Sequence, residues 1–421
     1  MKESTFKRRS WLDQCRVDTE APKIKLPEHV VRINSGMLDD KLYDLWHLGR
    51  DIILAWTPDK TGIELVVVPH YLIAEVVTSH HMEDAMEGHR LDERGMELIL
   101  TGSKLVSQER IQEISTLFDT TPVRIKLPFI PGKELELPTI DALIKRYSIS
   151  LVEDRAVALL DSVGFSMLSP FEQVTQLNSL AYSVNSAYSK LLSNDIDIKF
   201  ARTTTGDGFY IWNRDSSIQG NLNLYHFLHL VLADNAIARS KSSGRAVPYL
   251  RACFHVGSHY EFYQAEGLSP TAFSYIVGDV TIVLARMIDQ ALDGQVLFGQ
   301  FMAPMINVQS KETEYMDSLD FIKRAQSTIE NLHGVELAGD EVESIRCYLT
   351  GPCNQDGSYG ISKFCLRDKH GQKHEVFNAK INIHRRNARP VFLGLQHNEL
   401  ECFRRKTDEE IIHFSATGTK L

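Results

Sequence analysis

The order of apolar segments between residues 155 and 300 constrains the fold of this chain more than any other feature. The run RAVALLD predicts a buried strand over 155–161 that ends in an acid. An amphipathic helix follows over 171–191, and two strand-like runs then flank the turn TGDG. A second helix (222–238) and a further strand (247–256) complete the order β-α-β-β-α-β. This order predicts a ferredoxin-like α+β fold, an antiparallel-rich sheet with helices on one face.

The first predicted helix carries a regular apolar stripe. Its members recur at steps of three and four residues, and they are Phe171, Val174, Leu177, Ala181, Val184, Tyr188 and Leu191. Such spacing is typical of a helix face that packs into a hydrophobic core. We therefore expect the whole stripe to be buried.

The length of the chain predicts two or three domains. The 421 residues are 43% hydrophobic and 24% charged, which is typical of globular proteins and excludes collagen-like, coiled-coil and wholly disordered chains. We expect a polar tail over 1–35 and a small α/β domain of unknown role over 36–148. The ferredoxin-like domain should occupy 149–305, and a small β-rich domain 306–421.

Charge and cysteine content limit the partners and the compartment. Lys and Arg number 46 against 55 Asp and Glu, and the net charge of −9 argues against nucleic acid as a partner. Six scattered cysteines without a CxxC pair predict neither a disulfide framework nor a zinc ribbon. No secretory apolar region and no run of about 18 apolar residues occur. We expect a cytoplasmic protein that does not bind a membrane.

Two acids, Asp161 and Asp207, are the candidate metal ligands. Asp161 ends the first predicted strand, and Asp207 lies in the TGDG turn. A β-α-β-β unit pairs its first strand with the hairpin, so the two carboxylates should share one edge of the sheet. Nothing basic in LLDSVGF or TTTGDGF neutralises them, and adjacent carboxylates repel unless a divalent cation lies between them. We expect Mg²⁺ there, with backbone amides around Gly164 facing a phosphate.

Four motifs, in the same order along the chain, resemble those of class III nucleotidyl cyclases. LLDSVGFSMLSPFEQVTQLNSLAYSV resembles the family segment in which a metal-binding Asp precedes Gly-Phe-Ser/Thr, and TTTGDGFYIW resembles the segment of the second metal-binding Asp. LRACFHVGSHY loosely resembles the Gly-Ile-His-Thr-Gly strand. YIVGDVTIVLARMIDQAL resembles the helix Gly-Asp-x-Val-Asn-x-Ala-x-Arg. The resemblance covers about residues 150–305.

This resemblance implies a reaction and an assembly. Two Mg²⁺ or Mn²⁺ ions per site would be held by Asp161, Asp207 and the carbonyl of Ser162. The ribose 3′-hydroxyl of a nucleoside triphosphate would attack the α-phosphorus, forming a 3′,5′-cyclic nucleotide and expelling pyrophosphate. Arg286 would stabilise the charge that develops on the α-phosphate. Class III cyclases work as head-to-tail dimers whose sites combine the metal-binding acids of one subunit with the Arg of the other, so a homodimer is implied.

Two positions that read the base in this family fall at Thr203 and Tyr275. Adenylyl cyclases have Lys and Asp there, and guanylyl cyclases have Glu and Cys or similar residues, so neither purine code is present. A short hydroxyl and a bulky phenol suit a smaller ring, uracil or cytosine. UTP or CTP is therefore the expected substrate, and an adenylyl or guanylyl cyclase with an unusual base pocket is the alternative.

Other positions of the motifs bear on nucleotide binding. By motif register, Gly164, Phe165 and Gly206 would also contact the nucleotide. Ile282 stands where the family has the Asn that orients the ribose, and its side chain cannot form a hydrogen bond. A degenerate cyclase that binds nucleotide and signals by conformation therefore stays open as a non-enzymatic alternative.

The non-purine pair resembles the pyrimidine cyclases of bacterial Pycsar antiphage systems, whose cyclic CMP or cyclic UMP activates a separately encoded effector. The segment RDKHGQKHEVFNAKINI, over 367–383, resembles the small sensor domain named for adenylyl/guanylyl cyclases and SMODS enzymes. That resemblance implies a second messenger in antiphage defence. A plain β-rich packing or dimerisation module is the alternative for this segment.

Overall fold

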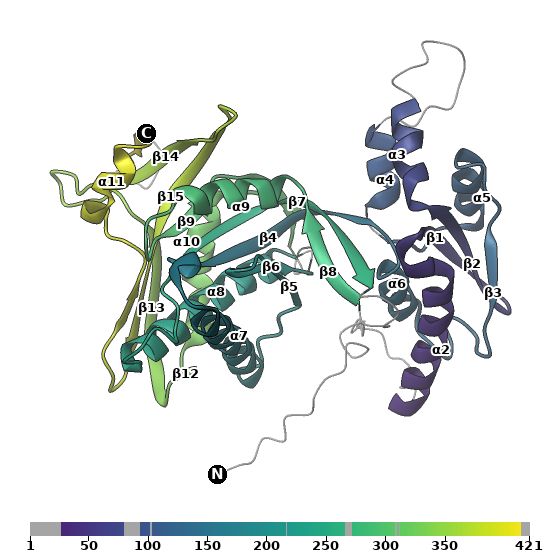
Figure 1. The fold of residues 1–421 in the computed structure, drawn as a ribbon, viewed down its shortest axis with the longest axis horizontal. Helices are drawn as coiled ribbons and strands as arrows, with labels where there is room; N and C mark the ends of the chain where they lie inside the picture. The colour runs from purple at the N-terminus through teal and green to yellow at the C-terminus, as the bar shows by residue number, and fades with distance from the viewer. Residues whose placement is uncertain are drawn as a thin grey trace. The chain divides into compact units, whose positions relative to one another are not determined.

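The chain divides into two compact units in the computed structural model (Figure 1). The described residues are 27–79, 93–101, 103–215, 217–265, 272–307, 310 and 312–413. Unit 1 comprises the described residues of Met1–Val152 and Tyr260–Ile276, and unit 2 those of Glu153–His259 and Val277–Leu421. Strands β4 (Ser150–Ser162), β7 (Leu250–Ala265) and β8 (Ala272–Val277) each begin in one unit and end in the other.

Unit 1 contains a three-stranded antiparallel sheet in the order β1-β2-β3. Its elements, in chain order, are α2 (Glu28–Trp46), η1 (His47–Gly49), β1 (Asp51–Asp59), β2 (Gly62–Pro69), α3 (His70–Ser79), α4 (Glu93–Leu100), α5 (Gln108–Leu117), β3 (Val123–Lys126) and α6 (Leu137–Lys145). Apolar residues of α2 and α6 cover one face of the sheet, and those of α4 and α5 cover the other. Helix α2 begins within the segment 1–35 that the sequence predicts as a tail, so residues 28–35 are helical, and residues 1–26 lie outside the described residues.

The first half of unit 2 has the predicted ferredoxin-like order. Its elements beside β4 and β7 are η2 (Phe165–Met167), α7 (Pro170–Ser193), β5 (Phe200–Thr204), β6 (Gly208–Asn213), α8 (Ile218–Lys241), α9 (Asp279–Gln290) and β9 (Val296–Gly299). The strands lie in the order β9-β7-β4-β6-β5. β6 pairs antiparallel with both β4 and β5, so the α+β fold expected from the sequence is confirmed.

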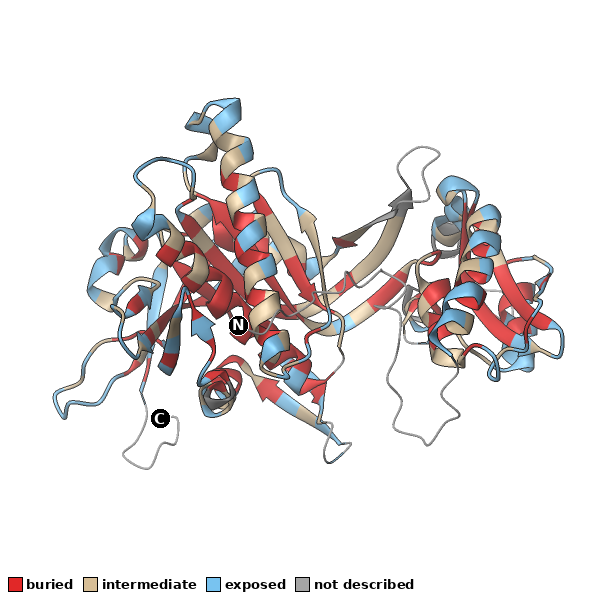
Figure 2. Cartoon of the chain, turned by 90° about the horizontal axis from the view of Figure 1, so that it is seen from below, coloured by how far each residue is buried: buried red, intermediate tan, exposed pale blue. Residues whose placement is uncertain are grey.

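Helices α7 and α8 cover one face of this sheet and form its main core (Figure 2). The Ser169 hydroxyl accepts a hydrogen bond from the Glu172 amide, and the Glu172 carboxylate accepts one from the Ser169 amide, a capping box that starts α7. Ser217 caps α8 in the same way through the Gly220 amide, at 2.9 Å. Because α8 is buried on almost all sides, its sequence is apolar around most of its circumference.

Helix α9 lies on the opposite face of the sheet, which differs from the prediction of helices on one face only. Phe209 and Ile211 of β6 contact the core with α7 and α8, so Tyr210 between them points the other way. The Tyr210 hydroxyl donates a hydrogen bond to the Thr281 carbonyl of α9, at 3.1 Å. The prediction therefore holds for α7 and α8 but not for α9.

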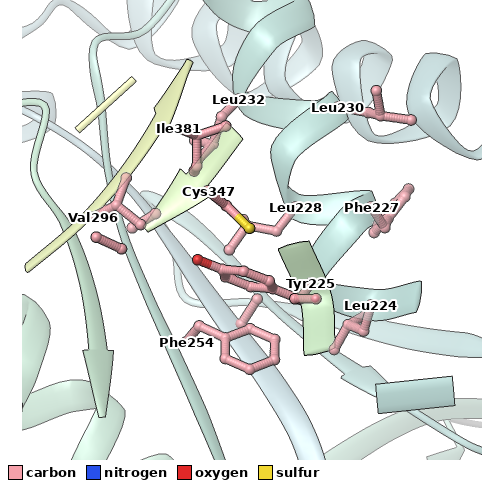
Figure 3. Close-up of a cluster of buried hydrophobic side chains, with 14 of the residues drawn as sticks. Leu224, Tyr225, Phe227, Leu228, Leu230, Leu232, Phe254, Val296, Cys347 and Ile381 are labelled. Atoms are coloured by element: carbon pink, nitrogen blue, oxygen red, sulfur yellow. The ribbon is translucent and has the colours of Figure 1, made fainter. Parts of the chain in front are cut away.

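Most strands of the C-terminal segment continue the same sheet, and its apolar residues join the same core. Its elements are β10 (Met302–Ile306), β11 (Thr313–Asp317), α10 (Ser318–Thr328), η3 (Ile329–Leu332), β12 (Glu336–Leu337), β13 (Asp340–Leu349), β14 (Ile361–Arg367), β15 (Lys373–Arg385), β16 (Val391–Leu393), η4 (His397–Leu400), α11 (Glu401–Arg404) and β17 (Asp408–Ile412). β15 pairs antiparallel with β9 and extends the order to β12-β13-β15-β9. Cys347 and Ile381 pack in one cluster with Tyr225 and Phe254 (Figure 3). The described residues of 306–421 therefore share a unit with 153–259, whereas the sequence predicts a separate domain.

The apolar stripe of α7 is buried only over its second half. Val184 and Leu191 are fully buried, whereas Phe171 is 79% exposed and Val174 is 59% exposed. The buried face of the helix instead contains Gln176, Leu180, Ser183, Val184, Ala187 and Leu191. The prediction of an entirely buried stripe is wrong, because two neighbouring helix faces carry apolar residues and only contact with the sheet selects one of them. None of the helices in the described part of the chain is long and apolar enough to cross a membrane.

Candidate active site

The structure brings Asp161 and Asp207 together at one end of the sheet. Asp161 pairs across the β4–β6 ladder with Gly208, and the Ser162 amide donates a hydrogen bond to the Asp207 carbonyl, at 3.2 Å. A Cβ atom at position 208 would lie 1.8 Å from the carbonyl oxygen of Leu160. Only glycine therefore lets the hairpin lie this close to β4, and the TGDG turn places the two carboxylates side by side.

Arg251 of β7 neutralises part of this acidic pair. Its Nε lies 2.6 Å from Oδ2 of Asp161, and its Nη1 donates a hydrogen bond to the Ala291 carbonyl, at 3.1 Å. Neither motif contains a basic residue, but a more distant strand supplies one, so the expectation of two carboxylates without a cationic neighbour is wrong. Arg251 was missed because it is 90 residues away in sequence, and only the pairing of β7 with β4 brings it to Asp161.

Burial and the Arg251 charge have opposite effects on the pKa of Asp161, a residue that is only 7% exposed. Burial raises the pKa of its carboxyl, the Arg251 guanidinium lowers it, and the neighbouring Asp207 raises it again, so the pKa lies above its ordinary value. When both carboxyls are ionised, one guanidinium leaves one negative charge of the pair uncompensated. A bound divalent cation would remove that charge and favour the ionised form of Asp161.

The donor set fits a divalent cation, with few protein ligands. Carboxylate oxygens are the ligands that Mg²⁺ and Mn²⁺ prefer. The Ser162 hydroxyl next to Asp161 is buried and has no hydrogen-bond partner among the described residues. Across all the residues that the structure describes, no group of three or more His, Cys, Asp and Glu side chains could hold a metal ion. Further ligands would have to be backbone atoms, water or the nucleotide itself.

The chain turns at Gly164, within the segment in which we expect backbone amides to face a phosphate. Gly164 adopts a left-handed conformation with φ of 68° and precedes the 3-10 helix η2, which starts at the half-buried Phe165. The Val163 amide donates a hydrogen bond to the Tyr249 carbonyl, at 2.8 Å, and the Gly206 amide donates one to the Thr204 hydroxyl, at 3.0 Å. These two amides are therefore used within the fold.

Thr203 lies on the same face of the sheet as Asp161. It pairs with Tyr210, which in turn pairs with Leu159, two residues before Asp161. Because side chains alternate along a strand, these residues share one face. Arg202 lies on the other face, with its guanidinium 5.4 Å from the centre of the Phe209 ring. The strand register therefore places Arg202 and Thr203 on opposite faces of the sheet.

Tyr275 belongs to unit 1, whereas Thr203 and Asp161 belong to unit 2. Within unit 1, the Tyr275 ring stacks on Phe262, with ring centres 5.7 Å apart and planes inclined by 24°. The two predicted base-reading residues are therefore carried by different units of this chain.

Arg286 lies on α9, and its ionic partners are acids other than the metal-binding pair. Its Nε is 3.5 Å from Asp368, and its Nη1 is 3.8 Å from Asp289. Ile282, one turn earlier on the same helix, is 49% exposed. No sequence signal predicts the contact with Asp368, since that residue belongs to the segment predicted as a separate domain.

Comparisons with known proteins find similarity in structure only. No family model matches the sequence, and no curated protein matches it. The guanylyl cyclase Cya2 is similar over 55% of this chain and 92% of its own, with 10% identity and a TM-score of 0.32. The adenylyl cyclase CyaB from P. aeruginosa (57% and 97% coverage) has 10% identity and a TM-score of 0.31. The guanylate cyclase domain of RhGC from Catenaria anguillulae (56% and 100% coverage) has 10% identity and a TM-score of 0.32. These values are too low to assign an activity to this chain.

Proposed function

We propose that this chain is a nucleotidyl cyclase that converts UTP or CTP to the 3′,5′-cyclic nucleotide and pyrophosphate. The observation that carries the proposal is the meeting of Asp161 and Asp207 at one end of a ferredoxin-like sheet, beside Arg251. The order of the four sequence motifs supports it.

The side chains of the site have distinct roles in this proposal. Asp161 and Asp207, with the Ser162 carbonyl, would hold two Mg²⁺ or Mn²⁺ ions. When bound, such ions acidify a hydroxyl and neutralise a triphosphate. Arg251 fixes the orientation of Asp161, because it is itself held by the Ala291 carbonyl. Arg286 would stabilise charge on the α-phosphate.

The choice of base would depend on Thr203 and Tyr275. Thr203 shares the face of Asp161, and its hydroxyl can both donate and accept a hydrogen bond. Neither residue is the charged partner that purine-specific cyclases use. The proposal therefore favours pyrimidine nucleotides. A purine product would overturn this choice of base but not the proposed cyclase reaction.

A homodimer is the proposed assembly. Four large apolar side chains are exposed along η2 and α7, namely Met167 (84% exposed), Phe171 (79%), Val174 (59%) and Tyr182 (66%). Exposed apolar groups at helical spacing are typical of a surface that a partner covers. A second copy of this chain would also supply Arg286 to the acids of the first.

The proposed biological role is the synthesis of a second messenger in antiphage defence, with a separate effector as the reader of the cyclic nucleotide. It depends on the resemblance of residues 367–383 to a sensor domain. In the structure, these residues form the turn before β15 and most of that strand.

The test is turnover of each nucleotide by purified protein. The protein is incubated with Mn²⁺ or Mg²⁺ and with ATP, GTP, CTP or UTP separately, and the products are identified by mass spectrometry. We expect cyclic UMP or cyclic CMP. Asp161→Ala and Asp207→Asn should each lower turnover by at least about 100-fold, because each removes a ligand of the proposed metal ions. Asp320→Asn, a substitution of an exposed acid on α10, is the matched control and should leave turnover unchanged.

Two results would contradict the proposal. Full turnover by Asp161→Ala or Asp207→Asn would overturn the metal assignment. Tight nucleotide binding without any product would instead favour a binding module, the second candidate function, which the exposed Ile282 at the ribose-orienting position supports.

A further inference from the structure

The turn between β14 and β15 presents one buried carboxylate, that of Asp368, toward α9. Oδ1 of Asp368 accepts hydrogen bonds from the amides of His370, at 2.8 Å, and Gln372, at 2.9 Å. Its side chain is only 2% exposed. The carboxylate is therefore held rigidly by the backbone of its own turn.

The second oxygen of Asp368 faces a guanidinium and an imidazole. Oδ2 lies 3.5 Å from Nε of Arg286 and 3.5 Å from Nε2 of His374. Burial alone raises the pKa of Asp368, but the amide hydrogen bonds and His374 lower it below its ordinary value. The carboxylate is therefore ionised at neutral pH and attracts the guanidinium.

The Asp368 carboxylate is the main compensation for the buried Nε of Arg286. The atom is buried and forms no hydrogen bond within the described residues, so the Asp368 carboxylate is its nearest compensating charge. The other ionic partner, Asp289, is 3.8 Å from Nη1 and is 63% exposed, so solvent weakens that pair. Nε of Arg286 is therefore held more firmly than the two terminal nitrogens of the guanidinium.

A cavity of about 110 Å³ borders the pair. Its lining includes Arg286, Asp289, Arg367, Asp368, Lys369 and His374. The guanidinium therefore has free space beside it, and close packing alone does not fix its position. An ionic contact from a rigid turn can fix it.

We propose that Asp368 is a positioning residue for Arg286, through which the C-terminal segment sets the geometry of the cyclase reaction. The carboxylate holds the Nε edge of Arg286 and leaves the terminal nitrogens to meet the α-phosphate. This inference rests on the proposed function, in which Arg286 acts on the transition state.

Steady-state kinetics of Asp368→Asn test the inference. Asn keeps an oxygen that can accept the two amide hydrogen bonds, so the turn should persist while the charge is lost. We expect kcat to fall about 10- to 100-fold with KM for the nucleotide within about twofold of wild type, since misplacing a catalytic group affects the transition state most. Asp368→Glu should recover part of kcat. Asp408→Asn, which breaks the exposed pair with Arg367, is the control and should not change kcat.

A double-mutant cycle separates this role from a general structural one. In an Arg286→Gln background, Asp368→Asn should cause no further loss of kcat, because Asp368 acts only through Arg286. A further loss of the same size, or an unchanged kcat in the single variant, would overturn the inference. An increased kcat would also overturn it, since Asp368 would then sequester Arg286 rather than position it.

Thermal unfolding of the wild type, the two single variants and the double variant tests the Arg286–Asp368 ion pair independently of catalysis. We expect the Tm shifts of Asp368→Asn and Arg286→Gln to be non-additive in the double variant. Additive shifts would overturn the inference even in an active enzyme. Non-additive shifts in a protein that converts none of the four nucleotides would overturn the proposed function and leave the Arg286–Asp368 contact established.

Discussion

Arg251 controls the electrostatics of the acidic pair. Its guanidinium is 2.6 Å from Asp161 and lowers the pKa of a carboxyl that burial and Asp207 raise. The ionised form of Asp161 is therefore favoured by a cation from a neighbouring strand. In the proposed metal site the same guanidinium would compete with the metal for the carboxylate, so Arg251 would both favour ionised Asp161 and limit its affinity for the metal.

Arg251→Gln should raise the acid limit of Mn²⁺ binding, which is the pH below which protonation prevents the ion from binding. Without the guanidinium, the pKa of Asp161 rises further, so protonation blocks the metal ligand at a pH where the wild-type carboxyl is ionised. We expect a shift of about one pH unit, which corresponds to about 1.4 kcal/mol. Mn²⁺ titration by calorimetry between pH 5 and pH 8 measures it. Arg386→Gln, at an exposed ion pair with Glu341, is the control, and equal acid limits in both variants would contradict the assignment.

At the scale of elements, α7 has two apolar faces with different uses. One face, with Leu180, Val184 and Leu191, packs against the sheet. The other presents Phe171 and Val174 to solvent. Burying such side chains against a partner would stabilise an assembly through the hydrophobic effect. The helix thus has one face for the core and one for the proposed dimer.

Phe171→Arg should weaken the dimer at least tenfold. A charged side chain in the middle of an apolar interface must be desolvated, and large aromatic residues often carry much of the binding energy, with about 1 to 4 kcal/mol lost on truncation. Sedimentation velocity across a concentration series measures the change, and turnover should fall with the dimer fraction. Tyr359→Arg, at an aromatic residue of similar exposure in the C-terminal segment, is the control. A wild-type protein that is monomeric and fully active would refute the proposed assembly.

At the scale of the whole molecule, the C-terminal segment is part of the core of unit 2. β15 pairs with β9, where Phe377 lies opposite Phe298, and both rings are fully buried. α10 packs against α8 through residues such as Phe321. Loss of packing at one end of this sheet should therefore destabilise the rest of the unit.

Phe377→Ala should destabilise all of unit 2 together. Truncating a buried Phe costs about 3 to 5 kcal/mol. Hydrogen exchange with mass spectrometry should show faster exchange both in β15 and in α8, because both contribute to one core. Phe392→Ala, on the neighbouring β16 and 58% exposed, is the control and should change neither segment. Faster exchange in β15 with α8 unchanged would mean that the C-terminal segment unfolds as a separate domain.

The sequence by itself determined the order of the elements and the position of the acidic turn. Apolar runs, capping residues such as Ser169, and the glycines of TGDG are local signals that act over a few residues. They were sufficient to predict the ferredoxin-like order and the meeting of Asp161 with Asp207.

Only the tertiary structure decided which distant groups meet these elements. Arg251 reaches Asp161, Asp368 reaches Arg286, and β15 joins β9 through contacts between segments some 70 to 90 residues apart. The choice between the two apolar faces of α7 and the position of α9 on the second face of the sheet were decided in the same way. Periodicity specifies that a face or an edge exists, whereas the burial of apolar surface over the whole unit selects what covers it.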